Sequence, residues 1–265
     1  MSGGRVRTLS VTPVKATRLQ VVDSVDLEET GARGNRRFFV IDQRDRMVNS
    51  KILGALQKVV SEFDEASRRL SFRFPDGRVV QDEVGAGGDE IEVRFFSSAR
   101  LARVIDGPWS QAVSDLVGQP LRLVDGGPAV DRGREGAVSL ISRASLDRLA
   151  SQAGVDDVDA RRFRMLIEVD GVDAHAEDSW IGRPVQVGPA VLRFEGNVGR
   201  CLITSRDPDT GEVTLSTLDV LREYRSDVEC TEPLPFGVYG RVLQGGRVSV
   251  GDPVAVGDPV IVSNV

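Results

Sequence analysis

Alternating apolar and polar residues recur along the chain and predict a structure rich in β-strands. Leu70, Phe72 and Phe74 alternate with polar residues, and the turn sequence Pro75-Asp76-Gly77 follows them. Such an alternation before a turn is typical of a half-buried β-hairpin, which we expect over residues 70–80. Further strands are predicted within the following ranges: 5–14, 33–42, 89–96, 121–124 and 138–141.

Helical spacing of apolar residues is confined to short stretches. One helix is expected around Trp109, and Pro120 ends it before the next strand. A second begins with Ser145 as its N-cap, and a third follows Ser216, which stands three residues before Asp219 in a capping-box-like arrangement. The chain is therefore predicted to be β-rich, with a few short helices.

The C-terminal tail carries the segment Gly-Asp-Pro-Val twice, at residues 251–254 and 257–260. Glycine-punctuated apolar alternation of this kind predicts a β-hairpin. Proline is tolerated at strand edges and turns, so the tail suits a strand that closes a barrel.

Composition narrows the classes of protein to which the chain can belong. Its 265 residues are enough for one large or two small domains. With 34 basic and 40 acidic residues the net charge is −6, which argues against bulk binding of nucleic acid. No apolar run approaches the roughly 20 residues that span a bilayer, and the N-terminus lacks the apolar core of a signal peptide.

The two cysteines and the single histidine also limit the chemistry. The cysteines have no paired spacing, which favours a reducing, cytoplasmic location over a disulfide framework. One histidine without a Cys-x-x-Cys pair excludes an ordinary structural zinc site. We expect a cytoplasmic protein that binds neither nucleic acid nor a membrane.

The candidate chemistry lies in residues 196–225. Cys201 follows two glycines and has Arg200 as its immediate neighbour. The run 202–204 is β-rich, and the residues Asp-Pro-Asp-Thr-Gly at 207–211 are typical of a tight turn. The pattern predicts a strand that carries the cysteine, a turn, a short strand and a short helix.

Two interpretations of Cys201 follow from the residues alone. A cation beside a thiol lowers the pKa from about 8.5 and favours the thiolate, the form that binds metals or attacks as a nucleophile. Alternatively, Cys201 is a small apolar side chain in a barrel core, which is the usual place of a free cysteine. Without further information the second interpretation is the more common one.

The string R-C-L-I-T-x-x-D-P-D-T-G, followed by L-x-x-L-R-E-Y-R, closely resembles the signature of MOSC-domain proteins. These include the mitochondrial amidoxime reducing component and its bacterial relatives. The resemblance spans nearly the whole chain and implies an α+β fold, mostly β. It further implies a β-rich MOSC N-terminal domain in residues 1–100 and a MOSC β-barrel domain in residues 101–265, with the helix around Trp109 at the seam.

The resemblance also implies a site. In the family the matching cysteine ligates the molybdenum of the molybdenum cofactor, which makes Cys201 both the metal ligand and the catalytic residue. Cations at matching motif positions contact the anionic cofactor, since arginine offers two parallel hydrogen bonds. The cofactor-binding residues implied here are Lys15, Arg37, Arg164, Arg200 and Thr204.

The chain departs from the family pattern at several of these motifs. Ala16 stands where a small hydroxyl residue is usual, and Arg36 stands where an aspartate is usual. Met165 and Leu166 replace a Pro-Asn pair, and leucine cannot make the hydrogen bonds of an amide. Residues 134–137 replace an element close to the metal. We therefore expect altered contacts to cofactor and substrate.

The acidic and aromatic residues after position 174 also match the family. We expect Glu177 and Asp178 to support the fold, Trp180 to pack against the barrel, and His175 to have no catalytic role.

The function implied by the resemblance is a molybdenum-dependent oxidoreductase. It would reduce small N-hydroxylated substrates with electrons from a separate protein partner. Two alternatives remain: a sulfur or molybdenum-cofactor carrier, and a metal-free MOSC enzyme in which Cys201 acts on a specialised substrate. Pyridoxal phosphate binding is a further family-level association.

Overall fold

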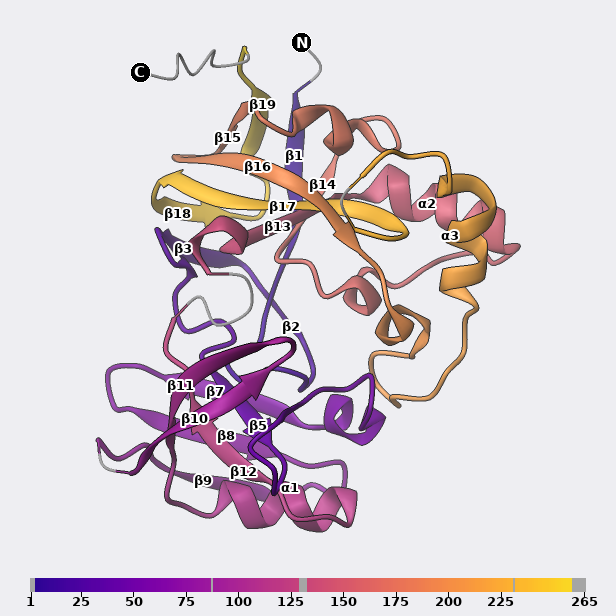
Figure 1. Cartoon of the computed structure of the whole chain (residues 1–265). Coiled ribbons are helices and arrows are strands. Elements are labelled where there is room, and N and C mark those ends of the chain that lie inside the picture. The colour runs from indigo at the N-terminus through magenta and orange to yellow at the C-terminus, as the bar shows by residue number, and fades with distance from the viewer. Residues whose placement is uncertain (1–2, 87, 129–132, 231, 259–265) are drawn as a thin grey trace.

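A closed barrel of seven strands forms the upper half of the computed structural model (Figure 1), which describes residues 3–86, 88–128, 133–230 and 232–258. The barrel closes because β14 pairs with both β13 and β1. β2 (Gln20–Val22) extends the sheet beside β1. In the order of the sheet, the barrel strands are β14 (Ile167–Asp170), β13 (Val138–Ser142), β17 (Pro235–Gln244), β16 (Ala190–Gly199), β15 (Pro184–Val187), β19 (Pro253–Val256) and β1 (Gly4–Val11).

Alternating apolar residues fill the barrel interior. Along β16, Leu192 and Phe194 are fully buried, and Trp180 packs against Phe194 with 6.5 Å between the ring centroids. Strands β16 and β17 form the longest pair, and their register shifts where they bend. Gly240 permits this close approach, because a Cβ atom there would lie 2.1 Å from the main-chain oxygen of Arg193. The sequence expectation that Trp180 packs on the barrel is confirmed.

A second group of sheets forms the lower half (Figure 1). Phe38 and Phe39 point to opposite faces of β5, and each lies in its own apolar cluster. The five-stranded sheet of this half, in its own order, contains β10 (Glu90–Phe95), β11 (Ser98–Val104), β12 (Arg122–Asp125), β5 (Phe38–Ile41) and β6 (Met47–Val48). The three-stranded sheet contains β7 (Val60–Asp64), β8 (Arg69–Arg73) and β9 (Val79–Glu83). The hairpin predicted over residues 70–80 is therefore present as β8 and β9.

The sequence suggested that the helix around Trp109 lies at the seam of the two domains. In the structure this helix lies inside the lower half. It is α1 (Trp109–Val117), and Trp109 is fully buried with its indole N–H donating to the oxygen of Leu70 at 3.0 Å. Because β12 pairs with β5, the chain returns to the barrel half only after Asp125. We therefore propose a division near residue 126 in place of 100, with β1 and β2 belonging to the barrel.

A small sheet packs on the barrel, because its residues Val25, Leu27, Ala32 and Val248 belong to the apolar cluster of the barrel. It contains β18 (Gly246–Ser249), β3 (Ser24–Glu28) and β4 (Gly31–Ala32), so the tail pairs with the segment that leads from the barrel to β5. The predicted C-terminal hairpin is wrong, because β18 pairs with β3 whereas β19 pairs with β1 and β15. Its predicted role in closing the barrel is confirmed through β19. Pro259 and Val260 of the second repeat lie outside the described residues.

Two further α-helices cover the barrel, α2 (Arg143–Ala153) and α3 (Thr217–Arg225). The N-cap of α2 is Ser142 and not Ser145: the Ser142 hydroxyl accepts from the amide of Ser145 at 3.2 Å. Ser216 is the N-cap of α3 as predicted, but its side chain makes no capping hydrogen bond with the described residues. Five short 3₁₀ segments complete the described secondary structure: η1 (Gly54–Lys58), η2 (Arg134–Gly136), η3 (Ala160–Phe163), η4 (Ala176–Trp180) and η5 (Leu202–Ser205).

The fold is thus α+β and mostly β, as the sequence predicts. Among the described residues, we find no helix with both the length and the apolar character needed to cross a bilayer.

Candidate functional site

Cys201 lies two residues beyond the end of β16, at the N-cap position of η5, and it is exposed. The expected β-rich run at 202–204 is wrong. Both the amide and the hydroxyl of Thr204 donate to the oxygen of Cys201, at 3.1 and 3.0 Å, and this closes a helical turn. The interpretation of Cys201 as a core side chain is also wrong. The thiol is available to a ligand.

Arg200 faces away from the surface that exposes the thiol. Its side chain is buried, and Nε and Nη1 donate to the oxygens of Phe236 and Phe163 at 2.8 and 2.9 Å. Nη2 contacts the sulfur of Met165 at 3.1 Å. These bonds attach the residue before Cys201 to β17 and η3. A contact between Arg200 and a cofactor would have to compete with them.

Thr204 is likewise buried, at 1% exposure. Its hydroxyl donates to Cys201, as described above, and its main-chain oxygen accepts from the Thr217 hydroxyl at 2.9 Å. Its contacts therefore shape the cysteine loop and connect it to α3.

Lys15 lies between β1 and the lower half. Its amide donates to the oxygen of Phe38 at 2.7 Å, which places it beside β5. The ammonium group lies 5.7 Å from the ring centroid of Phe95 and 5.5 Å from that of Phe96. Phe96 is 58% exposed and has a positive φ of 55°, which is unusual for a bulky residue. The sequence analysis did not identify Phe96 as a site residue, because the alternation pattern of the strand does not separate it from an ordinary strand residue.

Arg37 makes a forked ion pair with Asp125, the last residue of β12. Nε and Nη2 lie 3.1 and 2.7 Å from Oδ2, and hydrogen bonding to Asp125 raises the pKa of Arg37. Arg37 and Asp125 both line a cavity of about 230 Å³ that also contacts Arg68 and Arg103. Arg37 alone of the pair also lines a cavity of about 300 Å³, whose other walls include Glu28, Arg33, Asn35, Glu65 and Pro128. Asp125 was not identified from the sequence.

Arg164 connects the barrel to the segments that carry Lys15 and Arg37. Its Nη2 donates to the oxygen of Thr17 at 2.8 Å, and its own oxygen accepts a hydrogen bond from the guanidinium of Arg36. The replacement of aspartate by Arg36 thus supplies a new contact across the two halves. The sequence showed the replacement but not its partner.

Three residues with left-handed backbone lie at this junction. Ala16, Arg36 and Arg164 have φ values of 79°, 52° and 55°. Such conformations are unfavourable for residues with a side chain and concentrate at functional sites, where surrounding contacts maintain them. Arg164 is itself a predicted site residue. Ala16 and Arg36 are sequence neighbours of the predicted site residues Lys15 and Arg37.

The replaced Pro-Asn pair does not face this junction. Met165 and Leu166 are 6% and 3% exposed, and Leu166 belongs to the apolar cluster of the barrel. The other replaced element contains η2, in which Arg134 pairs with Glu29 at 2.7 Å. Residues 129–132 of that loop lie outside the described residues.

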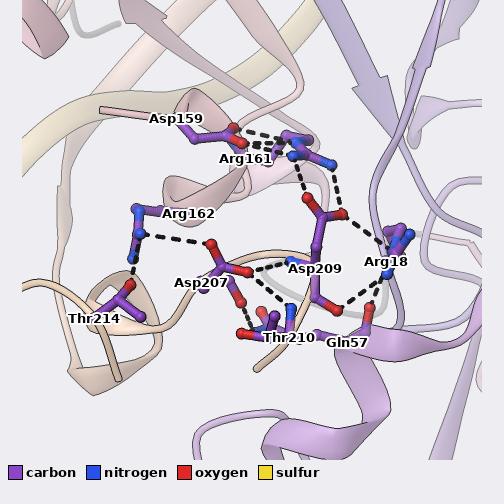
Figure 2. Close-up of polar contacts among 9 residues, drawn as sticks. All are labelled: Arg18, Gln57, Asp159, Arg161, Arg162, Asp207, Asp209, Thr210 and Thr214. Carbon is purple, nitrogen blue, oxygen red and sulfur yellow. Dashed lines mark hydrogen bonds and ion pairs between the residues drawn. The ribbon is translucent and has the colours of Figure 1, made fainter. Parts of the chain in front are cut away.

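The turn that follows the cysteine contacts three segments (Figure 2). Asp209 pairs with Arg161 of η3 and with Arg18 of the N-terminal segment. Gln57 of η1 donates to the oxygen of Asp207 at 3.1 Å. The predicted tight turn is therefore confirmed. Its ionic partners, far away in the sequence, were not foreseen.

Residues expected to support the fold do so. Glu177 is fully buried and accepts from the hydroxyl of Ser145 at 2.8 Å, while Asp178 accepts from Asn197 and Arg225 at 2.6 and 2.8 Å. Within the described ranges, no group of three or more His, Cys, Asp or Glu side chains is arranged to bind a metal ion.

Comparison with known proteins gives consistent matches. The MOSC domain model matches residues 125–255. The chain is 37% identical to mitochondrial amidoxime-reducing component 1 of Mus musculus over 264 residues, covering 90% of this chain and 75% of that protein. It is 27% identical to the Homo sapiens protein of the same name over 271 residues, covering 90% of this chain and 76% of that protein.

Two other similarities are more distant. A molybdenum cofactor sulfurase of Caenorhabditis briggsae is 25% identical over 234 residues, which cover 86% of this chain and 32% of that protein. The crystal structure of the YUAD protein from Bacillus subtilis matches with a TM-score of 0.44 and 14% identity, covering 95% of this chain and 94% of that one.

Proposed function

The chain belongs to the MOSC-domain family, and on this basis we propose that it binds the molybdenum cofactor and acts as an oxidoreductase. The observation that carries the proposal is the position of Cys201. Its exposed thiol begins a loop that contacts, through hydrogen bonds and ion pairs, the segments bearing Lys15 and Arg164. A free thiol whose loop is bonded to a strained, cationic junction is suited to an anionic metal group.

The chemical types of the side chains at the junction fit the molybdenum cofactor. A cysteine thiolate is a soft ligand suited to a transition metal. Lys15, Arg37 and Arg164 supply the cations that an anionic phosphate or dithiolene requires. We assign a different role to Arg200 and Thr204, whose contacts shape the cysteine loop.

The bound cofactor would supply two-electron oxo-transfer chemistry. This chain's own residues would attach the metal through Cys201, neutralise the anionic end of the cofactor and limit access to it. We propose small N-hydroxylated compounds as substrates. Two cysteines cannot provide the four thiolates of a usual iron–sulfur cluster, so we propose that a separate protein supplies the electrons. The cytoplasmic location and the pyridoxal phosphate association stay predictions.

A second function is a carrier of sulfur or of the cofactor itself. The exposure of Cys201 favours it, because an accessible thiol can accept and release a group.

Elemental analysis tests the proposal. Protein purified from a molybdenum-replete host is compared with Cys201→Ala and, as a matched control, Cys230→Ala. We expect near-stoichiometric molybdenum in wild type and Cys230→Ala, and its loss in Cys201→Ala. Absence of molybdenum from all three would contradict the proposal. Turnover of a benzamidoxime with a chemical reductant then separates the oxidoreductase from the carrier, which would retain metal without turnover.

A further inference from the structure

Asp209 connects segments that carry two of the proposed cofactor-binding residues (Figure 2). Its carboxylate accepts two bonds from Arg161, Nη1 to Oδ1 at 3.0 Å and Nη2 to Oδ2 at 2.8 Å. Arg18 places Nε 3.4 Å from Oδ1 and donates from Nη2 to the main-chain oxygen of Asp209 at 3.0 Å. In the sequence Arg18 comes three residues after Lys15, and Arg161 comes three residues before Arg164. One carboxylate thus joins both segments.

The geometry of Arg161 is fixed independently. Asp159 accepts from its Nε and Nη2 at 3.0 and 2.6 Å, so the guanidinium lies between two carboxylates. Hydrogen bonding to Asp159 and then to Asp209 raises the pKa of Arg161, and the bonds from Arg161 lower the pKa of Asp209. The pair is therefore ionised throughout the neutral range, and the fork defines an orientation as well as a distance.

The turn around Asp209 is internally bonded. The amides of Asp209 and Thr210 donate to Oδ1 of Asp207 at 3.0 and 2.8 Å, and the amide of Gly211 donates to the oxygen of Asp207 at 2.9 Å. The backbone also touches η1 here, because a Cβ atom on Gly211 would lie 2.2 Å from the oxygen of Gly54. The turn is therefore an internally bonded unit that packs on η1.

The same unit extends to the cysteine. The amide of Thr214 donates to the oxygen of Ser205 at 2.9 Å, which closes the loop at its base. From there η5 leads back to Cys201 through the two bonds that Thr204 makes with the Cys201 oxygen. A displacement of Asp209 is therefore transmitted to Cys201 through bonded backbone.

We propose that Asp209 is a positioning residue for Cys201. Through Arg18 and Arg161 it sets where the thiol lies relative to the segments of Lys15 and Arg164, across the junction of the two halves. The inference rests on the proposed function, because positioning matters only if Cys201 binds the cofactor. It adds a residue that contacts neither the thiol nor the metal.

Asp209→Asn is the main test variant, since it keeps the size of the side chain but removes its charge and one acceptor. Asp219→Asn is the matched control. Asp219 pairs with Arg222 at 2.6 Å within the exposed face of α3. Arg161→Lys is a milder second variant that keeps the charge but cannot donate two parallel bonds, and it is used if Asp209→Asn does not fold.

Hydrogen exchange of the full chain measures the loop directly. In Asp209→Asn we expect the amides of Thr204, Arg206 and Thr214 to exchange about tenfold faster, corresponding to roughly 1.4 kcal/mol. Barrel amides such as that of Phe194 should exchange as in wild type, and Asp219→Asn should match wild type throughout. Unchanged loop exchange, or a uniform increase across the barrel, would overturn the proposal.

Molybdenum content measures the consequence for Cys201. After dialysis, Asp209→Asn should retain several-fold less molybdenum than wild type, and Asp219→Asn should retain the wild-type amount. A loosened loop with wild-type molybdenum would overturn the positioning role and leave Asp209 as a structural tie only. If wild type itself lacks molybdenum, the proposed function fails and the positioning role fails with it, while the exchange result still establishes whether the tie exists.

Discussion

Arg37 and Asp125 form a forked ion pair between the residue that precedes β5 and the last residue of β12. The shorter of its bonds is 2.7 Å, and both side chains are at least partly buried. The pair lies where the chain leaves the lower half for the barrel, and Arg37 lines two cavities.

Arg37→Lys should weaken cofactor retention more than it weakens the fold. Lysine keeps the positive charge but loses the planar fork. Asp125 would then lose the parallel bonds from residue 37 and keep the one that it accepts from the amide of Gly127. We expect a loss of about 1 kcal/mol in the free energy of unfolding and a several-fold loss of bound molybdenum. Urea unfolding and elemental analysis measure the two effects. Wild-type molybdenum content in this variant would remove Arg37 from the proposed site.

Gly211→Ala should displace the cysteine loop. Gly211 has φ of +74°, and an added Cβ atom would meet the oxygen of Gly54 at 2.2 Å. Gly118→Ala is the control, because Gly118 has φ of +71° with no atom within 4 Å of the added Cβ. Both variants lose about 1 kcal/mol from backbone strain. Gly211→Ala should lose more stability than Gly118→Ala, because its added Cβ atom also meets η1. Gly211→Ala should also lose bound molybdenum, whereas Gly118→Ala should keep it. Equal behaviour of the two variants would contradict the docking of the loop on η1.

His175 should make the protein less stable in mild acid. Burial lowers the pKa of His175 to about 4, whereas an unfolded histidine titrates near 6.5. The unfolded chain therefore binds a proton first, so this contribution to stability is complete above about pH 6.5 and is lost as pH falls toward 4. His175 has φ of 62°, which asparagine also tolerates, so His175→Asn removes the titration without new strain. The urea midpoint of wild type should fall more between pH 7 and pH 5 than that of the variant. Identical pH profiles would show that His175 is not responsible.

Leu166→Asn should not restore cofactor contacts. Leu166 is 3% exposed within the apolar cluster of the barrel. The amide of an asparagine there would be buried among apolar side chains that offer it no hydrogen bond. We expect a loss of about 3 kcal/mol in the free energy of unfolding and no gain in molybdenum content. Thermal unfolding and elemental analysis measure the outcome. A gain of metal without loss of stability would mean that the position faces the site.

Local patterns in the sequence were sufficient for several strands and for the three α-helices. Alternation identified the β8–β9 hairpin, and the Asp-Pro-Asp-Thr-Gly turn was recognised because its residues satisfy their own backbone. The string around Cys201 indicated the family, which the comparisons confirm. Two wrong predictions, a strand at residues 202–204 and Ser145 as an N-cap, also concern contacts between residues close together in the sequence. β-branched residues favour strands only weakly, and the bonds of Thr204 to Cys201 outweighed that preference.

What the sequence by itself determined were the β8–β9 hairpin, the tight turn at 207–211 and the family, because these depend on residues close together in the chain. Tertiary structure alone decided which way each side chain faces and what it meets. Arg200 and Arg164 look alike as arginines beside the motif. One is buried among carbonyls of β17 and η3, whereas the other reaches Thr17 across the junction. The pairing of Asp209 with Arg161 and Arg18 joins residues 48 and 191 positions apart, and only the closed barrel and its docking on the lower half bring such distant charges together.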